Sequence, residues 1–187
     1  MSSEQSDKEL FECVGKESLS WVAQAKQLKM SADAILPKLK EAFRIPPALP
    51  GAQDGRFAFF HSYMLLVGLA FENLIKGILI GRNPALVDTE KVESGVLGRG
   101  GHGIADGARK IISLSSSEFR LLKRVEEYLF WAGRYPLPLK SNIYHNSETQ
   151  QLRSGRSDDP ELIDALFGKL VEILEQERKV RTTSPSA

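Results

Sequence analysis

A short run of the chain brings together three side chains whose types and spacing suit acid–base chemistry or anion binding. Glu72 and Lys76 are four residues apart, and Asn73 directly follows Glu72. If this run is helical, residues four apart share a face, so the carboxylate and the ammonium group can pair. The pair is either structural, with a buried Glu72 tied to another helix, or it lines a polar pocket in which the carboxyl pKa is shifted.

His102 is a second candidate for acid–base work, because an imidazole titrates close to neutral pH. It stands in the glycine-rich segment 98–103, just before a predicted short helix, where it could equally be a helix cap or a surface residue. The segment matches the letters of the GxGxxG phosphate-binding motif. That motif needs a strand before it and a helix after it, and no strand precedes it here, so the sequence does not favour a dinucleotide site.

Arg134 follows a predicted helix and is succeeded by Tyr135 and Pro136. A guanidinium group binds carboxylates and phosphates through two parallel hydrogen bonds. We predict a buried ion pair between Arg134 and Glu72, which would join two helices. The functional alternative leaves Arg134 ready for an RNA phosphate. A third hypothesis is a nucleotide or small-anion site beside Lys76 and Arg134, with Asn73 and Tyr135 as further ligand-binding residues.

A long polar segment, residues 137–157, separates the last two predicted helices. Basic groups accompanied by an aromatic side chain can contact single-stranded nucleic acid. A solvated, irregular loop is the simpler interpretation, and the sequence favours it. The side chains in question are Lys140, Tyr144, His145, Arg153 and Arg156.

The composition is that of an ordinary globular protein. Of 187 residues, 42% are hydrophobic and 26% charged, and the formal net charge is +1, so no overall field draws DNA or other polyanions. One cysteine excludes an intramolecular disulfide and indicates a reducing, cytoplasmic compartment. Three histidines and no cysteine pair predict no metal site, and no motif predicts a cofactor. Walker A, G-x-S-x-G and kinase signatures are missing from the sequence.

Hydrophobic periodicity predicts an all-α bundle of about five helices. We expect a disordered tail at 1–7, a single domain at 8–181 and a second disordered tail at 182–187. No stretch alternates long enough to form a strand. The helices are expected at 17–43 (kinked or broken near Pro37), 57–80, 104–112, from a capping box at Ser115 and Glu118 to Gly133, and from Asp158–Pro160 onward, with a proline-rich loop at 45–54.

The predicted helix 57–80 is apolar on nearly every face, apart from a stripe formed by His61, Gly68 and Glu72. Its length could span a bilayer, but its charged residues argue against a membrane location. A buried central helix is the favoured interpretation. Because this helix is apolar on more faces than four neighbours easily cover, we also expect self-association, with a homodimer as the simplest assembly.

Three stretches, LAFENLIKGILI, GHGIADGARKI and LLKRVEEYLFWAGRYPLPL, resemble bacterial proteins of the HEPN-like helical class. The resemblance covers roughly residues 57–140. It implies a dimeric all-α bundle in a defence, toxin–antitoxin or stress system, and many members of this class are metal-independent RNases with an R-x(4–6)-H motif late in the domain. Here Arg134 and His145 are too far apart for that motif, and Arg56 and His61 fit its spacing only at the start of the central helix.

Two functions follow from the residues and the resemblance together. The first is a non-catalytic helical module that binds RNA or a partner protein. The second is an endoribonuclease in which His102 acts as general acid or base, Arg134 stabilises phosphorane charge and Glu72 supports them.

Overall fold

The computed structural model describes residues 3–44, 55–97 and 101–183. The predicted loop 45–54, residues 98–100 of the glycine-rich segment and residues 184–187 lie outside this range. The described parts contain seven α-helices: α1 Ser3–Lys16, α2 Ser18–Arg44, α3 Gly55–Arg82, α4 Ile104–Arg109, α5 Ser116–Glu127, α6 Ser141–Thr149 and α7 Asp159–Thr183. The all-α class is confirmed, whereas the number of five helices is not.

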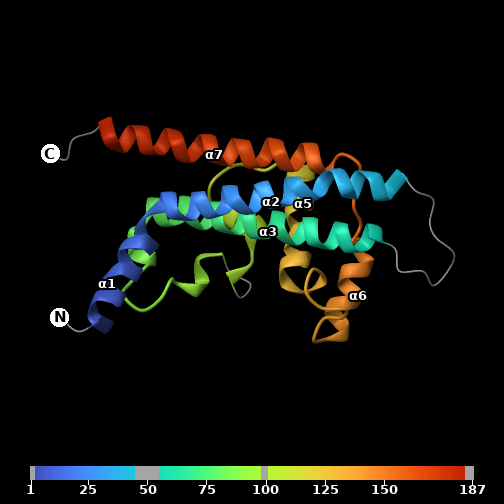
Figure 1. Ribbon diagram of the computed structural model, residues 1–187, viewed down its shortest axis with the longest axis horizontal. Helices are drawn as coiled ribbons and strands as arrows, with labels where there is room; N and C mark the ends of the chain where they lie inside the picture. Colours follow the sequence, from blue (N-terminus) through green and yellow to red (C-terminus); the bar gives the residue numbers. More distant parts are fainter. Residues whose placement is uncertain (1–2, 45–54, 98–100, 184–187) are drawn as a thin grey trace.

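Helix α3 is the centre of the bundle (Figure 1). Helices α2 and α7 run along it, α5 packs beside it, and α1 and α6 lie toward opposite ends. Residues Leu74, Ile75 and Ile78 of α3 are fully buried. The segment Arg56–Arg82 is long and apolar enough to cross a membrane, and 61% of its most apolar window is buried inside the structure. The core of the bundle therefore accounts for most of this apolar surface.

Helices α2 and α3 form the most extensive pairing in the structure. Small residues permit the close approach: Ala25 and Ala32 of α2 are fully buried, and a Cβ at Gly77 would lie 2.9 Å from the Cβ of Trp21. Helix α2 continues through Pro37, so of the two predicted alternatives, a kink or a break near this residue, the break does not occur. Beyond the proline, Leu39 is still buried, so the helix keeps an inward face past the lost backbone hydrogen bond.

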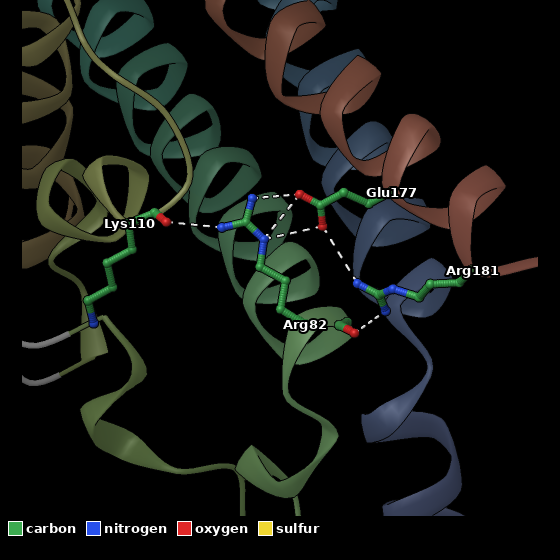
Figure 2. Close-up of polar contacts among 5 residues, drawn as sticks. Arg82, Lys110, Glu177 and Arg181 are labelled. Atoms are coloured by element: carbon green, nitrogen blue, oxygen red, sulfur yellow. Dashed lines mark hydrogen bonds and ion pairs between the residues drawn. The ribbon is translucent and has the colours of Figure 1, made fainter. Parts of the chain in front are cut away.

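Helix α7 is fixed to the rest of the bundle by charged groups at each end. At its start, Asp159 accepts hydrogen bonds from the buried guanidinium of Arg124 in α5 and from the backbone N–H of Arg156. Near its end, Glu177 forms a two-pronged ion pair with Arg82 at the end of α3 (Figure 2). Arg82 also donates to the carbonyl of Lys110 at 3.0 Å, so α3, α4 and α7 meet there.

The helix predicted after Ser115 begins as expected, with a capping box in which Ser115 and Glu118 bond reciprocally. Its last turn, Tyr128–Ala132, is a π-helix, and Gly133 ends it. A Cβ at Gly133 would lie 2.7 Å from the carbonyl oxygen of Tyr128 and 2.9 Å from Leu65 of α3. The end of this helix is therefore pressed against α3.

Three segments differ from the sequence-based expectation. Residues 3–7, expected in a tail, belong to α1, where Glu4 pairs with Lys8 and Gln5 donates to Glu9, both four residues on. Within the long segment 137–157, expected to be irregular, residues 141–149 form α6. Its polar sequence lacks a strong apolar stripe, but Ser147 is buried and Ile143 and Tyr144 pack against the core. The expected tail from residue 182 also differs, because α7 extends to Thr183.

Candidate functional site

Glu72 and His102 lie in direct contact although thirty residues separate them. One carboxylate oxygen of Glu72 is 2.8 Å from Nδ1 of His102, and the other is 2.6 Å from Nζ of Lys76. The Glu72 side chain is 10% exposed, Lys76 is 20% exposed and His102 is 31% exposed. Both carboxylate oxygens of Glu72 are thus occupied, and the imidazole is the most accessible member of the group.

A buried carboxylate that sequence analysis missed holds His102 in this position. Glu126 of α5 is fully buried and accepts a 2.7 Å hydrogen bond from the backbone N–H of Ala105, in the first turn of α4. Lys123 lies 2.9 Å from its other oxygen. Because α4 follows His102 directly, this bond anchors the segment that carries the imidazole. The sequence did offer a signal for this contact: Glu126 and Glu127 are consecutive acids within an apolar stripe. Buried acids need partners, so these two residues could have indicated a buried polar contact.

Asn73 does not join this group. Its side-chain amide donates to the carbonyl of Leu69 at 2.8 Å, one turn back on α3. It lines a separate apolar cavity between α1, α2 and α3, together with Phe11 and Trp21. The structure therefore separates Asn73 from Glu72, unlike the grouping expected from the sequence, because adjacent helical positions point about 100° apart.

The predicted ion pair between Glu72 and Arg134 is wrong. Arg134 is exposed, donates to the carbonyl of Phe130 at 2.8 Å and lies over the ring of Tyr135 at 5.5 Å. The π-helical turn and Gly133 place the end of α5 against Leu65, seven residues before Glu72. Seven residues correspond to about 10 Å along a helix. Arg134 thus lies near a different part of α3, so His102, Glu72 and Arg134 do not converge.

The R-x4-H pattern of Arg56 and His61 does not form a joint site either. Arg56 lies over the ring of Phe43 at the end of α2, 6.0 Å from its centroid. His61 packs against Tyr128, with ring centroids 5.5 Å apart. Burial, and secondly the charge of Arg153, lowers the pKa of His61 from its usual value. Within the structure the two residues thus have different neighbours.

Arg153 and Arg134 each form a stack with an aromatic ring, and both stacks adjoin Trp131. The guanidinium of Arg153 lies 5.4 Å from the Trp131 ring and 4.9 Å from the Tyr144 ring, and it is bonded to Glu148. The backbone N–H groups of Arg134 and Tyr135 donate to the Trp131 carbonyl at 2.8 Å. Trp131 itself is 2% exposed, whereas Tyr135 is 57% exposed. Trp131 is therefore buried beside the Arg153 stack, and its carbonyl fixes the backbone at Arg134 and Tyr135.

The segment that carries these residues is basic although the chain as a whole is nearly neutral. Residues 128–157 include four basic residues and one acidic residue, a net charge of +3, compared with +1 for the full sequence. The acidic residue, Glu148, is already paired with Arg153. Arg134 and Lys140 are exposed and have no ion pair within the described residues. We call the residues Arg134, Tyr135, Lys140, Tyr144 and Arg153 the basic–aromatic surface.

Among the described residues, no three His, Cys, Asp or Glu side chains are grouped so as to hold a metal ion. No family model matches the chain. A search of curated proteins and a search of solved structures also found no match. The function is therefore inferred from the residues and their geometry.

Proposed function

We propose that this chain is a HEPN-like helical module of a bacterial defence, toxin–antitoxin or stress system, and that it binds single-stranded RNA without cleaving it. The basic–aromatic surface carries this proposal. Single-stranded RNA is held by cations that track its phosphates and by aromatic or guanidinium planes on which its bases stack. Exposed Tyr135 with Arg134 over its ring, and half-buried Tyr144 with Arg153 over its ring, offer both.

The arrangement of Glu72, Lys76 and His102 supports a binding role rather than a catalytic one. Both oxygens of Glu72 are used within the protein, one by Lys76 and one by His102. An RNase site of the proposed kind needs a cation beside the imidazole to stabilise the phosphorane charge. Arg134 was the candidate for that role and lies elsewhere. The group therefore fits a polar network that ties α3 to the start of α4.

Binding of a fluorescently labelled, unstructured RNA, followed by anisotropy at several salt concentrations, tests the proposal. The double variant Arg134→Ala/Lys140→Ala should bind about tenfold more weakly. Its plot of log affinity against log salt should be shallower by about 1.4, the value for two lost phosphate contacts on a single strand. Tyr135→Ala should weaken binding with little change in slope, because it removes stacking rather than charge.

Lys26→Ala is the matched control, because Lys26 is an exposed lysine on α2, away from the basic–aromatic surface. It should bind RNA like the wild type. Equal losses in Lys26→Ala and in the double variant would show nonspecific charge attraction and contradict the proposal, as would the absence of binding by the wild type at low salt.

A second candidate function is RNA cleavage, which the contact between Glu72 and His102 favours. A carboxylate at Nδ1 orients an imidazole, which is the arrangement of a general acid–base pair. The same RNA, run on a denaturing gel after incubation, tests this function. Cleavage by the wild type that His102→Ala abolishes, with helicity retained by circular dichroism, would replace the binding proposal. We expect intact RNA with both proteins.

A further inference from the structure

A cavity of about 690 Å³ opens where α2 ends, α3 begins and residues 153–160 lead into α7. In Figure 1 this is the end of the bundle opposite α1. The volume lies within the range of sites for small organic ligands, which is about 300–1,000 Å³. The cavity is separate from Glu72, Asn73 and His102, none of which lines it.

The walls of the cavity are apolar and aromatic. Leu36 and Leu39 come from α2, and Phe57 and Phe60 come from α3. Phe57 is 64% exposed and Phe43, at the end of α2, is 58% exposed. Exposed phenyl rings bordering a cavity cost free energy in water and become favourable when a ligand covers them. The apolar part of a ligand is thus already matched by these walls.

The rim of the cavity is cationic. Arg44, Arg153, Arg156 and Lys40 line it. Arg153 is paired with Glu148, and Lys40 lies 4.0 Å from Glu161. The side chains of Arg44 and Arg156 have no ion pair or hydrogen bond within the described residues, and both are exposed.

The one carboxylate lining the cavity does not cancel this charge. Asp159 is 3% exposed and is held by the buried Arg124. Tyr63 also lines the cavity, and its buried hydroxyl has no hydrogen-bond partner among the described residues. Apolar walls, two unpaired guanidinium groups and an unsatisfied hydroxyl together describe a site for a molecule with one apolar body and one anionic head.

We propose that this cavity binds an amphipathic anion, a medium-chain acyl carboxylate or phosphate, with its chain against Leu36, Leu39 and Phe60 and its head between Arg44 and Arg156. The occupant is a small molecule. The cavity shares only Arg153 with the basic–aromatic surface, and the two residues that hold the head group, Arg44 and Arg156, lie outside that surface. A guanidinium group binds carboxylate and phosphate heads alike, so the head group is assigned by experiment.

Isothermal titration calorimetry with octanoate, decanoate, decyl phosphate and decanol, each below its critical micelle concentration, tests the proposal. We expect saturable binding of one anion per chain. Decanoate should bind about fifteenfold tighter than octanoate, because each of its two extra methylenes buries apolar surface worth about a fourfold change. Decanol should bind about tenfold more weakly than the better of the two decyl anions, since it lacks the charge.

Two variants locate the site. Arg44→Ala should weaken decanoate binding about tenfold and leave decanol binding unchanged. Leu36→Trp should fill the cavity and abolish binding of every ligand. If Leu36→Trp does not fold, as judged by circular dichroism, Arg44→Ala and the comparison of decanoate with decanol still decide the matter. Phe11→Ala, in the other apolar cavity, is the control and should bind like the wild type.

The proposal is overturned if no ligand gives saturable heat, if decanol binds as tightly as both decyl anions, or if Phe11→Ala rather than Arg44→Ala weakens binding. It fails separately from the proposed function. Arg134→Ala/Lys140→Ala should bind decanoate normally, because neither residue lines the cavity, and Arg44→Ala should bind RNA normally.

Discussion

His61 illustrates how the surroundings of one residue set its chemistry. It is half-buried on α3 between the rings of Phe60 and Tyr128, and Arg153 lies close enough to repel a second positive charge. Burial is the larger cause and Arg153 the smaller cause of its lowered pKa. Between its lowered pKa and the usual value of 6.5, the unfolded chain therefore binds more protons at this residue than the folded chain.

This difference predicts that the folded state loses stability in mild acid. The free energy of unfolding should fall as the pH drops below 6.5, because the unfolded state takes up more protons there. At higher pH His61 is neutral in both states and has no such effect. His61→Gln should lose part of this pH dependence, measured by urea unfolding at about pH 7.5 and about pH 5.5.

His145→Gln is the matched control, because His145 is exposed on α6. It should retain the pH dependence of the wild type. A His61→Gln protein whose stability falls as steeply as that of the wild type would contradict the prediction.

At the scale of residues, the sequence spacing predicted only those contacts that lie within one helix. The pair of Glu72 and Lys76 follows from their separation by four positions, and the structure shows it. The contact between Glu72 and His102 crosses two elements, so no local pattern could predict it. The ion pair predicted for Arg134 failed for a definite reason. The π-helical turn at Tyr128–Ala132 and the close packing of Gly133 direct the chain after α5 along a path that α-helical periodicity does not predict.

At the scale of elements, α3 depends on the absence of a side chain at Gly68. A Cβ there would lie 2.6 Å from Cγ of Leu129 in the π-helical turn, which is closer than real Cβ atoms approach. Gly168 in α7 offers the opposite case, because a Cβ there would meet nothing within 4 Å. The two glycines are both helical and thus form a matched pair.

Gly68→Ala should destabilise the protein by about 1–3 kcal/mol, because the new methyl group overpacks the contact between α3 and α5. Gly168→Ala should stabilise it by about 0.5–1 kcal/mol, because alanine loses less conformational entropy in a helix. Chemical denaturation measures both changes. Equal effects of the two substitutions would show that helix propensity, and not the close contact, dominates at Gly68.

The long helices were predictable because each carries a marked apolar pattern or a clear start signal. The capping box at Ser115 and the Asp-Pro start of α7 appear where the sequence indicates them. Helices α1 and α6 were missed because their stability depends on contacts that their own sequences do not reveal. Trp21 of α2, for example, donates to the carbonyl of Gly15 in α1 at 2.7 Å.

At the scale of the whole molecule, one apolar surface lies at the end opposite the basic–aromatic surface. Leu10 is 62% exposed, Phe11 is 43% exposed and Val14 is 49% exposed on α1. Apolar side chains gathered on one helix are typical of an association surface. We propose that this surface forms the expected homodimer. Light scattering after gel filtration should give twice the monomer mass, and Phe11→Glu should yield monomers; a wild-type monomer at high concentration would contradict this.

The segment 128–157 carries a net charge of +3, compared with +1 for the full chain, and the proposed function rests on its position. Photo-crosslinking of a 4-thiouridine-labelled single-stranded RNA to the wild-type protein, followed by mass spectrometry of the crosslinked peptides, tests this most directly. We expect the crosslinks at Tyr135 and Tyr144, the aromatic side chains of the basic–aromatic surface that bases can reach. Crosslinks confined to α1 or α2, or none above the level obtained with unlabelled RNA, would contradict RNA binding at this surface.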